Sequence, residues 1–230
     1  MSSLGFYGKL AGRGDFIHRG LSPTFIERWD AWLSAGMAAS QAALGAAWLD
    51  AYLVSPLWRF AVAPGLLGSE AAVGVMMPSV DRVGRYFPLT IALQLEAETD
   101  LGALVAGPDD WFEAAEALLL STLEPEAAVE AFEAEVPALG RPVCSTQVPG
   151  MPGLEGQVRF AATTAAARGA VLMQHACEGA SLWWGKGSGR VAAGLLRCQG
   201  LPAAQDFSGF LLGEGGYAAL TQTAQFDFGS

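Results

Sequence analysis

The sequence is poor in the residues that most often bind metals or form covalent cross-links. It has three cysteines, at 144, 177 and 198, and two histidines in 230 residues. The cysteine count is odd and no Cys-X-X-Cys pair occurs, so neither a zinc site nor a disulfide framework is indicated. We therefore predict no metal, no cofactor and a reducing, cytoplasmic environment.

Basic residues are also scarce, because 13 Lys and Arg stand against 23 Asp and Glu, giving a net charge of −10. Nucleic acids and anionic membranes both attract basic surfaces, so both kinds of partner are disfavoured. The N-terminus lacks the basic and apolar regions of a signal peptide. The uncharged stretch 31–49 has too few large apolar side chains for a membrane span. We predict no nucleic-acid partner and no membrane insertion.

The motifs of common enzymes are missing. "GKLAGRGDFIHRG" (8–20) does not complete GxGxxG, and "GASLWWGKG" (179–187) lacks the Ser or Thr that ends a phosphate-binding loop. GxSxG and HExxH do not occur. A triad of Ser79, His18 and Asp15 can be assembled from the sequence, but a histidine near Asp and Arg is more often structural. We predict no catalytic residues.

The sequence does contain enough apolar material for a sizeable core, since 52% of its residues are hydrophobic. Ser22-Pro23 is a typical helix start, and Ile26, Trp29, Leu33 and Met37 follow at helical spacing. A second helix is expected at 45–53. We predict that Trp29, Trp32, Trp58 and Trp183 lie in the core. Strands are expected in three mainly apolar segments, namely 57–63, 71–77 and 86–95.

Residues 91–140 contain many Asp and Glu and no Lys or Arg. The pattern predicts one helix that begins at Asp109 or Asp110 and a second with Pro125 in its first turn. Glu113 and Glu116 fall opposite the apolar stripe of the first helix. The acidic residues are therefore expected on solvated helix faces, with a docking surface for a basic partner as the alternative.

The last third predicts a helix at 160–177, strands at 181–185 and 189–196, and a short helix at 205–213. Interleaved helices and strands favour a layered α/β domain with a mixed sheet. We predict one domain over 1–230. Possible sub-lobes at 1–140 and 155–230 would flank the loop at 135–156, which is rich in Pro and Gly.

Two polar clusters remain. The first is Lys9, Arg13, Asp15 and Arg19, and the second is Ser79, Asp81, Arg82 and Arg85. Each places Asp beside Arg with a glycine nearby. Arginine suits either an Asp partner or an anionic ligand. The residues therefore either fix two loops through Asp–Arg pairs or face a partner or an anion, and catalysis is the weakest alternative.

Several short segments, taken in their order along the chain, resemble motifs of the TagF family of type VI secretion-associated proteins. These segments are "GFYGKLAGRGDFIHRGL", "WDAWL", "SPLWRFAVAPG" and "GVMMPSVDRVGRYFPLTIA", all within residues 5–93. "SLWWGKG" (181–187) and "GLP" (200–202) resemble the C-terminal part of the family more loosely. Ala11 stands where family members often carry proline.

The resemblance implies a three-layer α/β/α sandwich and a non-catalytic function. Family members restrain type VI secretion post-translationally by binding a forkhead-associated scaffold protein. Some relatives are fused to a phosphatase domain, for which this chain has no room. Two alternatives remain open. One is an enzyme or small-anion sensor that uses the clusters at 9–19 and 79–85, and the other is a structural component of the secretion apparatus.

Overall fold

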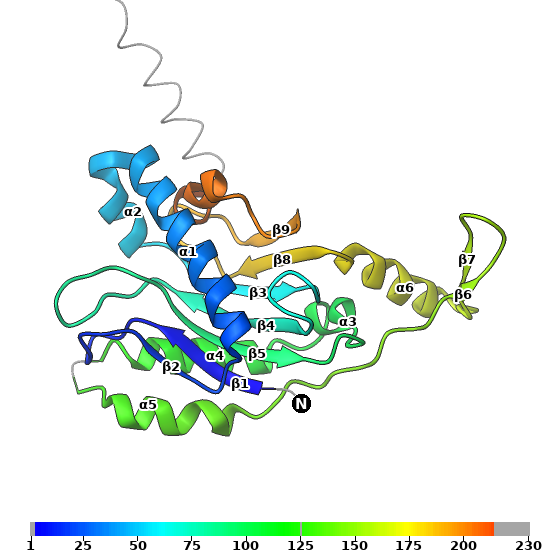
Figure 1. Ribbon diagram of the computed structural model, residues 1–230, viewed down its shortest axis with the longest axis horizontal. Coiled ribbons are helices and arrows are strands. Elements are labelled where there is room, and N and C mark those ends of the chain that lie inside the picture. Colours follow the sequence, from blue (N-terminus) through cyan, green and yellow to red (C-terminus); the bar gives the residue numbers. More distant parts are fainter. Residues whose placement is uncertain (1–2, 125, 214–230) are drawn as a thin grey trace, which may run out of the picture.

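The computed structural model describes residues 3–124 and 126–213. A seven-stranded sheet in the order β2-β1-β5-β4-β3-β8-β9 forms its centre (Figure 1). The strands are β1 (Ser3–Gly8), β2 (Ile17–Arg19), β3 (Trp58–Val62), β4 (Ala71–Met77), β5 (Leu89–Leu95), β8 (Ala180–Gly185) and β9 (Gly194–Gln199). A separate hairpin pairs β6 (Met151–Pro152) with β7 (Val158–Arg159).

The fold class is α/β, but the predicted mixed sheet is wrong. Every strand pair of the seven-stranded sheet is antiparallel. A parallel pair needs a long crossover connection, usually a helix. Here β3, β4 and β5 are instead joined directly by the short segments 63–70 and 78–88. The helical connections from β2 to β3 and from β5 to β8 therefore cross the sheet without producing parallel neighbours.

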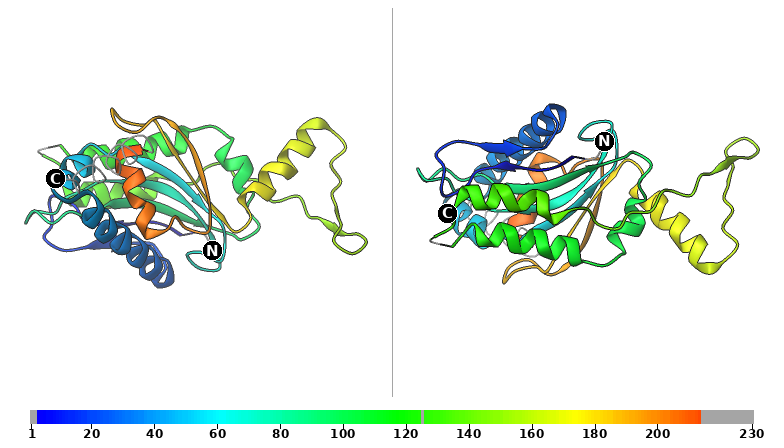
Figure 2. Two further views of the ribbon diagram at one scale, coloured as in Figure 1. Left: turned by 90° about the horizontal axis from the view of Figure 1, so that it is seen from above. Right: turned by 90° about the horizontal axis from the view of Figure 1, so that it is seen from below.

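Helices cover both faces of the sheet. The helices are α1 (Pro23–Leu44), η1 (Gly45–Ala47), α2 (Trp48–Leu53), α3 (Leu101–Val105), α4 (Asp110–Ser121), α5 (Val129–Glu135), η2 (Val136–Leu139), α6 (Ala165–Cys177), which extends beside the sheet, and η3 (Ala204–Asp206). Residues 207–213 are also helical. Helices α1 and α2 lie on one side with residues 204–213, and α4 and α5 lie on the other (Figures 1 and 2).

Alternation along the central strands produces two cores. On β3, Trp58, Phe60 and Val62 join α1 and residues 207–212 in one cluster, whereas Ala61 joins α4 and α5 in the other. Successive side chains of a strand point to opposite faces, so the strands of a sheet that is covered on both sides are buried along their whole length and mostly apolar. This explains why β4 and β5 are continuous runs of buried residues.

The start of α1 follows the sequence prediction closely. Ser22 caps the helix by accepting a hydrogen bond from the amide of Phe25, and Pro23 occupies the first turn. Trp29 is fully buried and lies 6.0 Å from Trp183, ring centre to ring centre, in a stacked arrangement. All four tryptophans predicted for the core are buried.

Three predicted boundaries in the second half differ from the structure. The helix expected from residue 160 begins at Ala165, because the Thr164 side chain caps it. The strand expected at 189–196 begins at Gly194, because a turn in which the Ser188 amide donates to the Val191 carbonyl oxygen precedes it. Helix α5 begins at Val129, and Pro125 lies outside the described residues.

Candidate functional site

The two polar clusters meet where two loops lie side by side. One loop, residues 9–16, joins β1 to β2, and the other, residues 78–88, joins β4 to β5. Strands β1 and β5 are antiparallel neighbours, so the end of one and the start of the other lie at the same edge of the sheet. The amide of Arg82 donates to the carbonyl oxygen of Arg13 at 3.0 Å. We call residues 9–16 and 78–88 the paired loops.

Asp81 is the centre of the paired loops and is only 3% exposed. Its Oδ1 accepts hydrogen bonds from the amides of Val83 at 3.0 Å and Arg85 at 2.9 Å. Its Oδ2 accepts from Lys9 Nζ at 3.0 Å and from Arg85 Nε at 2.7 Å. One carboxylate therefore shapes its own turn and also binds the neighbouring loop. Gly84, with φ of 85°, allows the chain to turn there.

The environment of Asp81 favours its ionised form. Burial alone would raise the pKa of this carboxyl, but the hydrogen bonds from the Arg85 amide, Lys9, the Arg85 side chain and the Val83 amide outweigh burial. The pKa of Asp81 is therefore held well below its usual range. Lys9 is itself only 5% exposed, so Lys9 and Asp81 form a buried ion pair.

Ser79 uses its polar groups inside the fold. Its hydroxyl donates to the carbonyl oxygen of Lys9 at 2.8 Å. The Tyr52 hydroxyl binds the Ser79 backbone twice: it donates to the Ser79 carbonyl oxygen and accepts from the Ser79 amide, both at 2.9 Å. His18, the histidine of the triad with Ser79 and Asp15 considered above, lies on β2 opposite Tyr7. The hydroxyl of Ser79 thus stabilises the contact between the loops.

The outer part of the paired loops faces solvent. The Arg85 guanidinium donates to the carbonyl oxygen of Gly14 and lies 3.9 Å from the fully exposed carboxylate of Asp15. Arg82 is exposed, and the neighbouring Val83 side chain is 63% exposed. The inner residues therefore hold the turn, while Arg82 and Val83 form its exposed tip.

Two of the predicted site residues leave this cluster and bind α5 instead. Arg13 Nη2 lies 3.0 Å from Glu130 Oε1, and Arg19 Nη2 lies 2.8 Å from Glu133 Oε2. The residues of the two predicted clusters are therefore divided between two places in the structure. Lys9, Asp15, Ser79, Asp81, Arg82 and Arg85 come together in the paired loops, whereas the side chains of Arg13 and Arg19 attach the first loop and β2 to α5.

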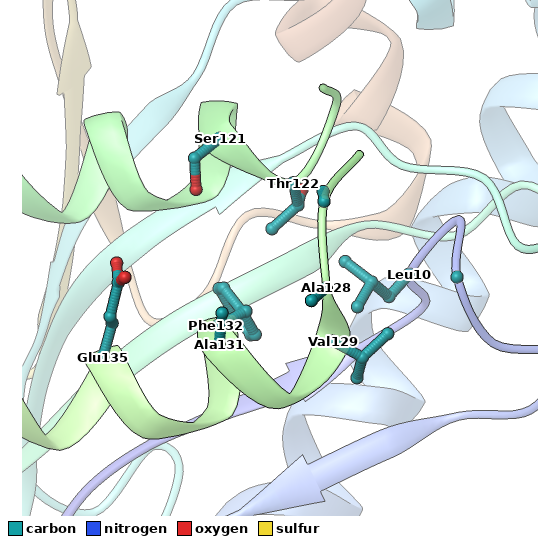
Figure 3. Close-up of a pocket in the computed structure, with 10 residues that line it drawn as sticks. Leu10, Ser121, Thr122, Ala128, Val129, Ala131, Phe132 and Glu135 are labelled. Atoms are coloured by element: carbon teal, nitrogen blue, oxygen red, sulfur yellow. The ribbon is translucent and has the colours of Figure 1, made fainter. Parts of the chain in front are cut away.

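Two cavities lie near the paired loops. The larger, of about 160 Å³, is lined by Leu10 and Gly12, the end of α4 and the first two turns of α5 (Figure 3). The other, of about 10 Å³, lies between α2, the ends of the 78–88 loop and residues 207–211. The charged side chains of the paired loops line neither cavity.

A second ionic cluster was not expected from the sequence. Arg59, 2% exposed on β3, binds Glu116 of α4 through Nε at 2.6 Å and Nη2 at 3.1 Å. Asp109 lies 2.6 Å from Arg59, and Lys186 lies 3.4 Å from Glu116. The prediction that Glu116 lies on a solvated face is therefore wrong. An arginine within a run of apolar strand residues is the one sequence signal for such a cluster, because a buried charge needs a partner.

The fold and the paired loops define an α/β domain with a charged loop surface, held by hydrogen bonds and ion pairs, at one edge of its sheet. A family model for the N-terminal domain of TagF, described as type VI secretion system-associated, matches residues 5–139. The chain belongs to this family.

A solved structure is similar over nearly the whole chain. The crystal structure of PA0076 from Pseudomonas aeruginosa PAO1 is 65% identical, covers 93% of this chain and 96% of its own, and superposes with a TM-score of 0.89. No curated protein matches the sequence. In the described ranges 3–124 and 126–213, the helices are all too short or too polar to cross a membrane.

Proposed function

We propose that the chain is a non-catalytic accessory protein that represses type VI secretion post-translationally in the cytoplasm by binding a forkhead-associated scaffold protein. Membership of the TagF family supports the link to type VI secretion. The observation that carries the binding role is the construction of the paired loops, whose buried charges bind each other and whose tip is exposed.

The inner contacts of the paired loops give this tip a defined shape. Asp81 alone fixes the backbone at Val83 and Arg85, and Arg82 is held by its amide against the other loop. A loop that is rigid before binding loses less conformational entropy on binding, which favours affinity. Arginine is also enriched among the residues that contribute most to interfaces. We assign Arg82 and Val83 to the contact with the scaffold.

The geometry of the paired loops disfavours the alternative of an enzyme or a small-anion sensor. Such a site is normally a concave pocket with converging polar groups. In the paired loops, Lys9 and Arg85 both bind Asp81, and neither lines the two cavities described above. These cations neutralise a carboxylate of the protein itself, which supports a binding surface over an anion pocket.

A genetic experiment tests the proposal. Deleting the gene should raise secretion of the tube protein of the apparatus, and the wild-type gene should restore repression. A gene that encodes the Arg82→Glu variant should not restore repression, although the variant protein should accumulate to the wild-type level. Unchanged secretion after deletion would overturn the proposal. Appearance of the protein in stoichiometric amount in purified secretion assemblies would instead indicate a structural component.

A further inference from the structure

The segment 141–177, which we call the arm, extends away from the sheet. It runs from η2 through the β6–β7 hairpin to α6, and the hairpin projects beyond the rest of the fold (Figures 1 and 2). Large apolar side chains on the arm are unusually exposed, including Leu154 at 77% and Leu172 at 71%. Several exposed large apolar side chains on one segment commonly mark an interaction site.

The base of the arm is attached firmly to the body. The amide of Asp100 donates to the carbonyl oxygen of Ser145 at 2.8 Å. Val148 and Gln174 exchange two hydrogen bonds of 2.9 and 3.2 Å, which join the outgoing segment to α6. The backbone of Gly102 on α3 packs directly against Met173. The hairpin is therefore held out from the body by specific contacts at its base.

Leu154 lies at the turn of the hairpin, between β6 and β7. The amide of Gly153 donates to the carbonyl oxygen of Gln157, and the amide of Gln157 donates to that of Leu154, so the turn is closed. The hairpin thus presents one apolar side chain at its end. Arg159 lies next to this turn and is exposed, and none of the ion pairs among the described residues includes it.

The cavity beside α5 has the complementary shape and chemistry. Its large apolar lining residues are Leu10, Val129 and Phe132, its small ones include Ala128 and Ala131, and Ser121, Thr122 and Glu135 line its polar side (Figure 3). Its volume of about 160 Å³ compares with roughly 150 Å³ for an apolar protein cavity that binds benzene. The four-carbon side chain of leucine is smaller than benzene, so one leucine fits.

The charges of the two surfaces are also complementary. The arm carries Arg141, Arg159 and Arg168 against Glu155 alone. Around the cavity, acidic side chains outnumber Arg13 and Arg19, and they are Glu124, Glu126, Glu130, Glu133 and Glu135. The basic arm with an apolar tip is therefore matched by an acidic surface whose cavity has an apolar side formed by Leu10, Val129 and Phe132. Such complementarity favours docking and fixes its register.

We propose that the chain associates with a second copy of itself, the Leu154 tip of one copy entering the α5 cavity of the other. The hairpin and the first turn of α5 lie at opposite ends of the molecule, so one chain does not reach its own cavity (Figures 1 and 2). Two copies side by side in opposite directions exchange tips and form a closed pair with two identical contacts. This proposal is independent of scaffold binding.

Sedimentation velocity of the full chain over a wide range of protein concentration tests the proposal. The wild type should show reversible association that weakens as salt rises, because exposed complementary charges are screened. Leu154→Asp and Ala131→Phe, which remove the tip and fill the cavity, should each weaken association about tenfold or more. Leu53→Asp, at an exposed leucine of α2, is the matched control and should associate like the wild type.

Mixing the two variants makes the test specific. Leu154→Asp keeps an intact cavity and Ala131→Phe keeps an intact tip, so an equimolar mixture should recover association through one tip and one cavity. Circular dichroism and melting temperature establish that each variant folds. A monomeric wild type, unchanged association of either variant, or a mixture of folded variants that stays monomeric would each overturn the proposal.

Discussion

Each carboxylate oxygen of Asp81 accepts hydrogen bonds from two donors within the paired loops. Its partner Lys9 is buried and reaches it from the other loop. Removing one member of a buried ion pair leaves an uncompensated charge, which costs more than the pair itself contributes. At the residue scale, the exposed tip of the 78–88 loop therefore depends on a buried ion pair between Lys9 and Asp81.

Replacing Asp81 with Asn should lower the melting temperature by several degrees, because Lys9 loses its counter-charge and the turn loses an acceptor. Asp15→Asn is the control, since this carboxylate is fully exposed and 3.9 Å from Arg85. Differential scanning calorimetry at neutral pH compares the variants. Equal melting temperatures for Asp81→Asn and Asp15→Asn would contradict the role given to Asp81.

The same residue predicts a dependence on pH. The pKa of Asp81 is lower in the folded chain than in the unfolded chain, where Asp has a pKa of about 3.9. Its stabilising contribution is complete above that value and is lost as pH falls through the folded-state pKa. The difference in melting temperature between the wild type and Asp81→Asn should therefore shrink as the pH is lowered below about 4. A constant difference from pH 6 to strongly acidic solution would show that ionisation of Asp81 is not involved.

The buried ion pair between Arg59 and Glu116 should also contribute to stability. Glu116→Gln should lower the free energy of unfolding by about 3 kcal/mol, because Arg59 keeps its buried charge and loses its bidentate partner. Glu113 lies 3.9 Å from Arg59 and is half exposed, so Glu113→Gln should cost less than about 1 kcal/mol. Urea denaturation measures both values. Similar losses for the two variants would mean that Glu116 is not the main partner of Arg59.

At the scale of elements, α1 connects the sheet to the C-terminal helical residues 207–213. Gly36 lies on the buried face of α1, and a Cβ atom placed there would come 2.4 Å from the ring of Phe207. Phe207 in turn packs against Trp32 and Phe210. The glycine therefore sets how closely the two helical segments approach.

Gly36→Ala should destabilise the fold by about 1–3 kcal/mol, because the added methyl group overpacks the contact with Phe207. The matched control is Gly169→Ala on α6, where no atom lies within 4 Å of the added Cβ. That change should stabilise its helix by up to about 1 kcal/mol, since alanine has the higher helix propensity. Stabilisation by both substitutions, measured by urea denaturation, would contradict the packing described here.

The sequence predicted the elements whose signals are local. Ser22-Pro23 marks the start of α1, and the unbroken apolar run at 71–77 coincides with β4. The direction of strand pairing was not predictable, because it depends on how the connections run through space. The Arg59–Glu116 pair was missed for the same reason, since its members are 57 residues apart. The acidic pattern of α4 is compatible with either an exposed or a buried glutamate.

The sequence indicates the contacts within the 78–88 loop but not those between this loop and the rest of the fold. The sequence places Asp81 and Arg85 close together with Gly84 between them, and in the structure Asp81 accepts hydrogen bonds from the amide and side chain of Arg85. Their contact with Lys9 depends on β1 and β5 being neighbours in the sheet. Arg13 and Arg19 bind an acidic helix more than a hundred residues further along the chain, and nothing local to either arginine indicates that.

At the scale of the whole molecule, we expect Arg85 to contribute to stability and Arg82 to contribute to binding. Arg85→Glu should lower the free energy of unfolding by about 1–2 kcal/mol, because it removes the bonds to Asp81 and Gly14 and adds a repulsive carboxylate. Arg82→Glu should leave the melting temperature unchanged, because that side chain is exposed. Thermal melts of both variants check this, and a destabilised Arg82→Glu would assign Arg82 to the fold.

The most direct test of scaffold binding is a calorimetric titration of the purified chain with the forkhead-associated scaffold protein. We predict saturable binding by the wild type, loss of about tenfold or more in affinity for Arg82→Glu, and wild-type affinity for the control Leu195→Asp, at an exposed leucine of β9, the edge strand farthest from β1 and β2. Absence of binding by the folded wild type, or equal affinity of the wild type and Arg82→Glu, would contradict the assignment of the paired loops as the surface that binds the scaffold.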